Sequence, residues 1–182
     1  YVGTLNRFRQ LDFLFEVLKH VLPRHPRAHL LMVGGGKDTE DLKWLKHRAS
    51  ELGVEENVTF TGWVPQEEVP AYIRASDVGV SPFVPNKVLI NNSPIKLLEY
   101  MALEIPVVAT DIPEQRKIIE ESRGGVCVPW NVEKFAQGVC DLLEEGEEQK
   151  KVRVTRGRQW VRKNRDFRVL TRIVQDAYER LL

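Results

Sequence analysis

The chain has 182 residues, of which 42% are hydrophobic and 29% are charged, a balance typical of one folded globular domain and not of a disordered or fibrous protein. Its 27 lysines and arginines offset its 26 acidic residues, so the net charge of +1 gives no reason to expect a nucleic-acid partner. No apolar run approaches the roughly 20 residues of a membrane-spanning helix, and only two cysteines are present, which favours a reduced, cytoplasmic protein over a disulfide-stapled one.

Short apolar segments alternate with amphipathic stripes along the chain. The segments expected to form strands are residues 1–4, 28–33, 57–61, 78–81, 106–110 and 125–128. The stripes expected to form helices are residues 11–22, 42–52, 67–75, 93–103 and 116–120, and helices continue from Val132 onward. An irregular loop at residues 82–92 interrupts the pattern, and loops of this length on a rigid sheet often carry function.

This alternation predicts an α/β fold. Several of the six expected strands are apolar on both faces, and such strands form a parallel sheet that helices cover on both sides. We therefore expect a single doubly wound, Rossmann-like domain over residues 1–182, with a parallel sheet of about six strands and C-terminal helices appended at 147–182. Ligands of open α/β sheets bind beyond the carboxyl ends of the strands.

A glycine turn follows the second expected strand. The sequence Gly34-Gly35-Gly36-Lys37 lies between a strand and a helix, where backbone N–H groups and a helix N-terminus can approach a phosphate. A plain tight turn explains the same glycines. A nicotinamide-dinucleotide site would need a third glycine where Thr39 stands and an acidic residue after the next strand, where Gly62 stands, so both positions argue against a dehydrogenase.

The strongest signal is the segment from Asn91 to Ala102. Ser93 is a good N-cap and Pro94 suits the first helical position, so local chemistry predicts a helix start here. The free N–H groups of Ile95 and Lys96, the positive end of the helix and the Lys96 ammonium together favour a diphosphate ligand.

Glu99 lies one helical turn after Lys96 on roughly the same face. There, its carboxylate can accept hydrogen bonds from the two hydroxyls of a ribose. The plain alternative is a surface ion pair between Lys96 and Glu99, which would contribute only about 0.3–0.5 kcal/mol.

Residues 93–102, followed by 105–111, resemble the nucleotide-sugar signature of the family-four retaining glycosyltransferases of GT-B fold. The resemblance extends in the right order over about residues 1–145 and includes the segments 1–3, 33–36, 60–65, 75–78 and 124–126. In that family the C-terminal domain holds the nucleotide-sugar donor and an N-terminal domain supplies most of the acceptor site. The resemblance implies that this chain is the donor-binding domain, that the N-terminal domain is a missing partner, and that no cofactor or metal is needed.

The family's binding residues can be carried over by position. The resemblance gives the ribose role to Glu99, the nucleobase contact to Trp63 and Val64, and the donor sugar to Asn91 and Asn92. The implied diphosphate residues are Gly3, Arg9, Gly35, Ser93, Pro94, Ile95 and Lys96.

Two positions depart from the family pattern. Asn91 stands where the family has a catalytic glutamate near the donor sugar, and an amide cannot stabilise a developing positive charge as a carboxylate can. Thr4 stands where the family has an arginine, so Arg9 is the expected diphosphate clamp, with Arg7 as a competitor.

The C-terminal segment carries two further patterns. Ten basic residues lie between Lys150 and Arg172 against the single acid Asp166, which indicates a solvated helix face or, alternatively, contact with an anionic membrane surface or a lipid-linked acceptor at the inner face of the membrane. Residues Phe167 to Leu181 form an apolar stripe, which would be exposed, folded back or used in self-association. In the family such a helix crosses to the other domain.

The sequence thus favours transfer of a sugar from a nucleoside diphosphate sugar to an unknown acceptor, with retention and without a metal. The chain alone is expected to bind nucleotide but to turn over little. Two alternatives stay open: a non-catalytic nucleotide-sugar-binding module, suggested by Asn91 and Thr4, and another GT-B enzyme such as a nucleotide-sugar epimerase.

Overall fold

The computed structural model describes residues 1–36 and 38–180, so the glycine-turn residue Lys37 and the stripe residue Leu181 lie outside the described residues. The strands are β1 (Leu30–Val33), β2 (Val58–Gly62), β3 (Gly79–Ser81), β4 (Val107–Thr110) and β5 (Gly125–Val128). The helices are α1 (Phe13–Val21), α2 (Thr39–Glu51), α3 (Val69–Arg74), α4 (Ile95–Ala102), α5 (Pro113–Ser122), α6 (Val132–Leu143), α7 (Glu147–Asn164) and α8 (Phe167–Glu179). Short 3-10 helices lie at Arg7–Arg9 and Glu55–Asn57.

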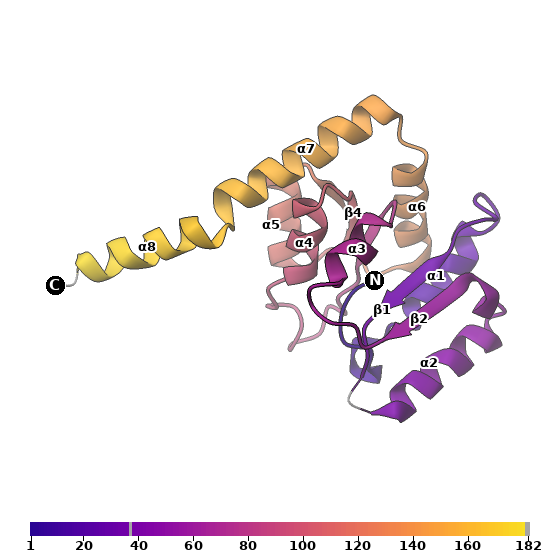
Figure 1. Ribbon diagram of the computed structural model, residues 1–182. Coiled ribbons are helices and arrows are strands. Elements are labelled where there is room, and N and C mark those ends of the chain that lie inside the picture. The colour runs from indigo at the N-terminus through magenta and orange to yellow at the C-terminus, as the bar shows by residue number, and fades with distance from the viewer. Residues whose placement is uncertain (37, 181–182) are drawn as a thin grey trace.

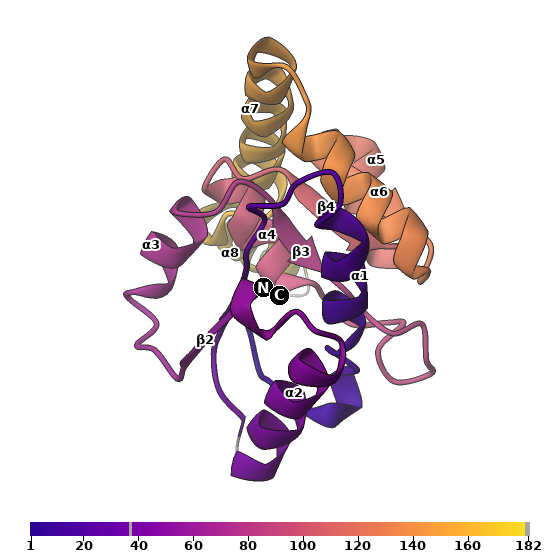
Figure 2. The same cartoon turned by 90° about the vertical axis from the view of Figure 1, so that its right-hand side faces the viewer.

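All pairings between these strands are parallel. β1 pairs with β2, and β3, β4 and β5 form a second sheet in that order. Helices lie on both faces of the strands, as Figures 1 and 2 show. The predicted α/β, Rossmann-like architecture with appended C-terminal helices is therefore confirmed.

The predicted strand count is too high, because five strands form among the described residues and the first expected strand does not. Residues 1–4 contribute only an isolated bridge between Val2 and Val33. The Val2 N–H donates to the hydroxyl of Tyr100 at 2.8 Å, so a side chain takes the place of a neighbouring strand. Gly3 then turns the chain away from strand geometry with a φ of 140°.

Two buried clusters hold the strands to the helices. One is centred on Phe15 and Phe135, which are fully buried, and includes the ring of Phe13 stacked on Trp130 with centroids 4.1 Å apart. The other joins α4 to β4 and α5. Burial of each such large side chain contributes about 1.5–3 kcal/mol, so these clusters fix the strand ends that carry the site.

The C-terminal helices form an arm. α7 packs against α4 and α5, where Gly124 and Gly157 come so close that a Cβ on Gly124 would lie 2.9 Å from the Gly157 Cα. α8 then leaves the body of the molecule (Figure 1) and exposes its apolar stripe, with Phe167 85% and Tyr178 67% exposed. The stripe is therefore exposed and not folded back, and its use in self-association stays a prediction. No helix in residues 1–36 and 38–180 is both long and apolar enough to cross a membrane.

Candidate functional site

Three predicted loops meet at the carboxyl ends of β1 and β2. The Leu5 N–H donates to the Gly35 carbonyl at 3.1 Å, and the Gly34 N–H donates to the Gly62 carbonyl at 3.2 Å. A Cβ added to Gly35 would lie 3.3 Å from the backbone nitrogen of Trp63, and one added to Gly34 would collide with the Gly3 carbonyl. Gly34 therefore permits a backbone approach that any side chain would prevent, and Gly35 leaves room that a side chain would crowd.

The first turn of α4 reaches the same place. A Cβ added to Gly3 would lie 3.5 Å from Cε of Lys96, so the Lys96 side chain runs alongside the Gly3 backbone. Its Nζ lies 5.1 Å from the centroid of the Tyr1 ring and 4.6 Å from that of Phe83. Aromatic faces attract a cation, so the two rings hold the ammonium in place.

The surroundings of Lys96 nonetheless disfavour its charged form. Burial, and then the nearby charge of Arg9, lower the pKa of Lys96 to about 8, while Glu99 opposes this shift. Among the described residues, no carboxylate lies within 4.0 Å of the Lys96 ammonium. The predicted alternative of a Lys96–Glu99 ion pair is therefore wrong.

Arg9 is the second cation without a carboxylate partner. It ends the short Arg7–Arg9 helix, which Asn6 caps by accepting a hydrogen bond from the Arg9 N–H at 3.2 Å. The Arg9 Nε is buried and has no hydrogen-bond partner in the described part of the chain. Its charge is close enough to Lys96 to lower the pKa of that lysine.

The competing candidate, Arg7, is engaged elsewhere. Its Nε lies 3.5 Å from a carboxylate oxygen of Asp41, and its guanidinium lies 5.4 Å from the centroid of the Trp44 ring. These contacts direct Arg7 toward α2, so Arg9 is the arginine that the structure leaves available beside Lys96.

Glu99 lies one turn further along α4 and is half-buried. Burial raises the pKa of the Glu99 carboxyl, and the charge of Lys96 opposes that rise. With no cation within ion-pair distance in the described residues, its oxygens are available as acceptors for ligand hydroxyls.

The start of α4 differs from the prediction by one residue. Pro94 is the N-cap, with φ −85° and ψ 74°, and the Ser93 side chain makes no capping hydrogen bond. The Ile95 N–H donates to the Ser93 carbonyl at 3.0 Å, which closes a tight turn before the helix begins. The expected Ser93 cap and free Ile95 N–H are therefore wrong, whereas the Lys96 N–H has no acceptor among the described residues.

A buried polar cluster, absent from the sequence prediction, anchors Phe83. The Phe83 N–H donates to the Thr110 hydroxyl at 2.7 Å, and that hydroxyl donates to the Phe83 carbonyl at 2.9 Å. Gln115 donates from its Nε2 to the Thr110 carbonyl at 2.8 Å. The available signal was Gln115 itself, a polar residue on the same helical stripe as Ile118 and Ile119.

The remaining predicted residues differ in how far they are exposed. Trp63 is 79% exposed, and Val64 beside it is half-buried. Asn91 is exposed and Asn92 half-buried in the loop before α4. No group of three or more His, Cys, Asp and Glu side chains suited to a metal ion occurs in residues 1–36 and 38–180.

Comparison with known proteins agrees with this arrangement. The family described as glycosyl transferases group 1 matches residues 1–145. The chain is 30% identical over 153 residues to the GDP-mannose-dependent alpha-(1-6)-phosphatidylinositol monomannoside mannosyltransferase of Mycobacterium tuberculosis, which covers 82% of this chain and 39% of that relative.

Solved structures show the same fold. HepE of Anabaena, in complex with UDP and glucose, has a TM-score of 0.75 at 21% identity, over 99% of this chain and 46% of HepE. The C-terminal domain of the group 1 family glycosyl transferase LpcC of Francisella tularensis has a TM-score of 0.70 at 19% identity, over 89% of this chain and 82% of that domain.

The chain thus spans 39% of the mycobacterial mannosyltransferase, less than half of its length. The family match covers most of the described residues and includes every loop of the site above. The expected GT-B type of domain is also the fold of the solved relatives. The chain therefore belongs to the group 1 glycosyltransferases.

Proposed function

We propose that this chain is the donor-binding half of an enzyme that transfers a sugar from a nucleoside diphosphate sugar to an acceptor, with retention and without a metal ion. The observation that carries the proposal is the pair Arg9 and Lys96, two adjacent cations without carboxylate partners in the described residues. Burying unpaired charge is costly, so such a pair is expected where a ligand supplies the opposite charge.

A diphosphate has the charge that this pair lacks. Arg9 can donate two parallel hydrogen bonds to phosphate oxygens, and Lys96 adds a point charge held between the Tyr1 and Phe83 rings. The free N–H of Lys96 adds the positive end of α4, and Gly35 allows the backbone to come close. Negative charge grows on the diphosphate as the sugar leaves, so these groups stabilise the transition state more than the bound donor.

The rest of the donor is assigned by position. Glu99 accepts hydrogen bonds from the ribose hydroxyls, Trp63 and Val64 contact the nucleobase, and Asn91 and Asn92 face the sugar. The relatives support a nucleotide-sugar donor, since one is named a GDP-mannose-dependent enzyme and another is seen with UDP and glucose.

The acceptor site is assigned to a second half of the enzyme. The apolar stripe of α8 supports this, because Phe167, Ile173 and Tyr178 are exposed on a helix that contacts only α7 closely. We assign this stripe to contact with the acceptor half, and the chain alone should bind nucleotide with little turnover. Contact of the basic arm with an anionic membrane or a lipid-linked acceptor stays a prediction.

Titration calorimetry with UDP and GDP tests the donor site. We expect Glu99→Ala to weaken both nucleotides by about 10–100-fold, because hydrogen bonds to a charged acceptor are worth about 1.5–3 kcal/mol. Glu104→Ala, at the other end of the same helix region and ion-paired with Arg158, is the matched control and should leave both affinities unchanged. Equal affinity in Glu99→Ala and the parent chain would overturn the ribose assignment.

Two assays separate transfer from the alternatives. The full-length enzyme, given a panel of donors, should release nucleoside diphosphate only when it transfers sugar. Nucleotide binding without any turnover would favour a non-catalytic module. Inversion at C2 of the free nucleotide sugar would favour an epimerase.

A further inference from the structure

The loop between β3 and α4 begins where two neighbouring strands separate. β3 and β4 are paired as far as Ser81 and Ala109, and the next residue of β4, Thr110, is paired with β5 alone. The chain after Ser81 therefore leaves the sheet and forms the loop at residues 82–92, which leads to the first turn of α4. The groups that fix the start of this loop also fix one side of the donor site.

Gln115, in the first turn of α5, bridges the two separating strands. Its Nε2 donates to the carbonyls of Thr110 at 2.8 Å and Ser81 at 3.2 Å, while its Oε1 accepts from the Ser81 hydroxyl. A backbone amide in a paired strand would make bonds of the same kind. The fully buried Gln115 side chain thus takes the place of the ladder that ends at Ser81.

Thr110 carries this bridge to Phe83. Its hydroxyl accepts from the Phe83 N–H at 2.7 Å and donates to the Phe83 carbonyl at 2.9 Å. The Gln115 Nε2 lies 3.2 Å from the same hydroxyl oxygen. Since a hydroxyl offers one donor and two acceptor positions, these contacts use all of them. The orientation of the Thr110 hydroxyl is thereby fixed, and with it the backbone of Phe83.

Apolar contacts dock the rest of the loop. Phe83 packs in a small buried cluster with Leu89 and Ile112. Asn86 accepts a hydrogen bond from the Leu89 N–H at 2.8 Å, which closes the turn between the two ends of this cluster. The loop is therefore held at its start and in its middle, with the Phe83 ring 4.6 Å from the Lys96 ammonium.

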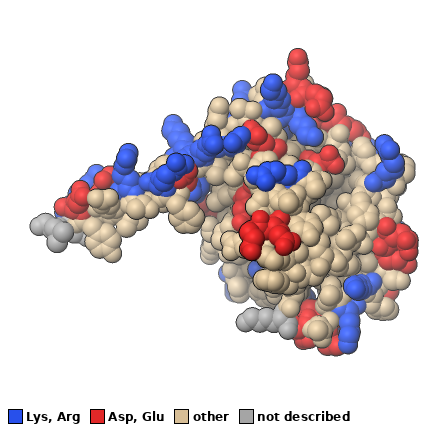
Figure 3. Space-filling model, in the orientation of Figure 1, with Lys and Arg blue, Asp and Glu red and all other residues tan. Residues whose placement is uncertain are grey.

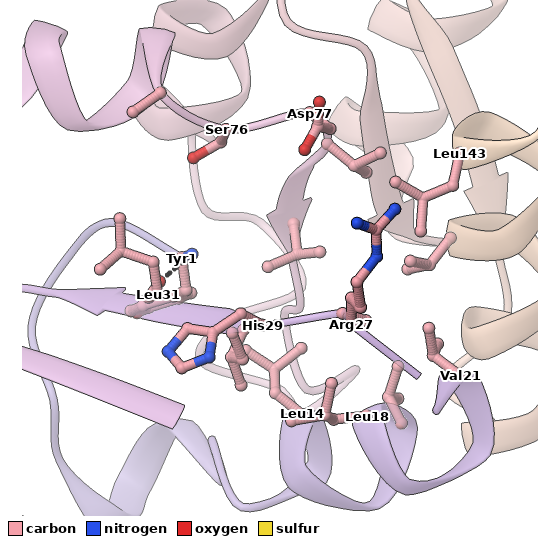
Figure 4. A pocket seen from close by; sticks show the side chains of 17 residues that line it. Tyr1, Leu14, Leu18, Val21, Arg27, His29, Leu31, Ser76, Asp77 and Leu143 are labelled. Atoms are coloured by element: carbon pink, nitrogen blue, oxygen red, sulfur yellow. Dashed lines mark hydrogen bonds between the residues drawn. The ribbon is translucent and has the colours of Figure 1, made fainter. Parts of the chain in front are cut away.

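The other end of the strands is packed mainly by apolar side chains. Figure 4 shows Leu14 and Leu18 of α1 and Leu143 of α6 near the start of β1 and β3. A buried network whose hydrogen bonds are all made specifies one rigid arrangement, more than apolar packing does. The buried polar bridge thus lies at the end of the strands that carries the site.

We propose that Gln115 is a positioning residue of the donor site, an inference that rests on the function proposed above. It holds Phe83 through Thr110 and keeps that ring against the Lys96 ammonium. This role accounts for a buried glutamine on the face of α5 that also buries Ile118. Buried hydrogen bonds add only modestly to stability, so the main contribution of the bridge is the arrangement that it fixes.

Nuclear magnetic resonance on the unliganded chain tests the placement. An aromatic ring shifts protons above its face upfield, so the Lys96 Cε protons report the position of Phe83, and Phe83→Leu defines the part of the shift due to that ring. Gln115→Met keeps the side-chain length without the N–H donors and should lose most of that part. Thr110→Val should lose it as well, whereas Thr110→Ser, which keeps the hydroxyl, should retain it. Should Gln115→Met not fold, the Thr110 pair decides the path through which Gln115 acts.

Titration calorimetry with UDP tests the consequence for binding. Gln115→Met should weaken UDP by about two- to fivefold, the range expected when a cation loses one aromatic face. In a Phe83→Leu background the same substitution should cause no further loss, because Gln115 acts through Phe83. UDP carries no sugar, so this titration is independent of Asn91 and Asn92.

Ser122→Ala is the matched control. Ser122 is buried at the other end of α5, and its hydroxyl accepts from the Gly124 N–H at 3.1 Å. The substitution should lower the melting temperature and leave the Lys96 signals and UDP affinity unchanged.

Two results would overturn the role of Gln115. One is a Gln115→Met chain whose Lys96 signals match those of the parent, and the other is an equal loss of UDP affinity with and without the Phe83 ring. A parent chain that binds no UDP would instead refute the donor site, while the Lys96 signals would still decide whether Gln115 places Phe83.

Discussion

Two basic regions of this molecule differ in how their charges are paired. On the C-terminal arm, Arg153 contacts Glu145 at 2.6 Å and Arg165 contacts Glu114 at 2.9 Å. Figure 3 shows this arm as a line of Lys and Arg side chains along the surface. At the donor site, Arg9 and Lys96 have no carboxylate within 4.0 Å in the described residues, and the charge of Arg9 lowers the pKa of Lys96.

The absence of carboxylate partners, and not the number of basic residues, therefore marks a site for an anion. Ten basic residues crowd the segment from Lys150 to Arg172, yet several are neutralised by carboxylates supplied elsewhere in the fold. The exposed pair of Arg158 with Glu104 contributes little to stability, whereas the pair of Arg153 with Glu145 is largely buried. Two cations held together without partners keep an unfavourable interaction that an anionic ligand removes, which is a signature of binding and not of stability.

Removing the Lys96 charge should have the largest effect on this contrast. Lys96→Met should weaken UDP binding by about 10–100-fold, because charge-assisted contacts to phosphate are worth about 1.5–3 kcal/mol. The unliganded chain should lose no stability, since the substitution removes a partly buried charge that Arg9 repels. Titration calorimetry and thermal melting measure the two effects.

The matched control is Arg153→Met on the arm. It leaves Glu145, only 10% exposed, without its partner and should lower the melting temperature while leaving UDP affinity unchanged. Stability loss in Lys96→Met and affinity loss in Arg153→Met would reverse the assignment of the two regions.

Arg9 and Arg7 provide a second comparison within one short helix. Arg9→Met should weaken UDP binding by about tenfold or more, because Arg9 is the unpaired arginine next to Lys96. Arg7→Met should leave affinity unchanged, because Arg7 is engaged with Asp41 and Trp44. The same calorimetric titration of both variants decides, and a larger loss in Arg7→Met would make Arg7 the clamp.

The parts of this site that are local in the chain can be predicted from the sequence. Lys96 and Glu99 lie on neighbouring turns of one helix, and helical spacing predicts that. The sequence does not decide between Arg9 and Arg7 as the diphosphate clamp, because that choice depends on the contacts of Arg7 with Asp41 and Trp44, which are distant in the sequence. The Tyr1 and Phe83 rings around Lys96 are likewise brought together only by tertiary packing.

The fold prediction was right where the pattern is local in the chain, and wrong where a contact with a residue distant in the sequence decides the structure. Strand and helix patterns from β1 to α6 are local and were recognised. The first expected strand is reduced to the Val2–Val33 bridge, because the Val2 N–H bonds to the Tyr100 side chain and Gly3 leaves strand geometry. The helix start at Pro94 was misplaced by one residue because the Ile95 N–H closes on the Ser93 carbonyl, a detail that capping preferences do not specify.

The protonation of Lys96 should make both UDP affinity and chain stability depend on pH. The pKa of Lys96 is about 8, so UDP affinity should fall between about pH 7 and about pH 10 as the ammonium loses its proton. The folded-state pKa lies below the unfolded value of 10.5, so the folded chain binds fewer protons between these two values and the Lys96 contribution to stability rises with pH there. Affinity and stability should therefore change in opposite directions.

Lys96→Met separates this titration from others. The variant should show a smaller fall of affinity between about pH 7 and about pH 10, because the titrations of UDP itself are common to both chains and only that of Lys96 is removed. A profile with the same slope in the variant would assign the titration to another group.

The smallest expected effect concerns the ring that holds Lys96. Phe83→Leu keeps an apolar side chain but removes the aromatic face 4.6 Å from the ammonium, and should cost about 0.5–1 kcal/mol of UDP affinity. The loss also disfavours the charged form, so the pH at which affinity falls should move below that of the parent chain. Phe83→Tyr retains the face and should restore both properties, whereas Phe8→Leu, at an exposed phenylalanine, should change neither. A Phe83→Leu variant with weaker binding but an unshifted pH profile would mean that Phe83 acts on binding by shaping the loop and not through the charge of Lys96.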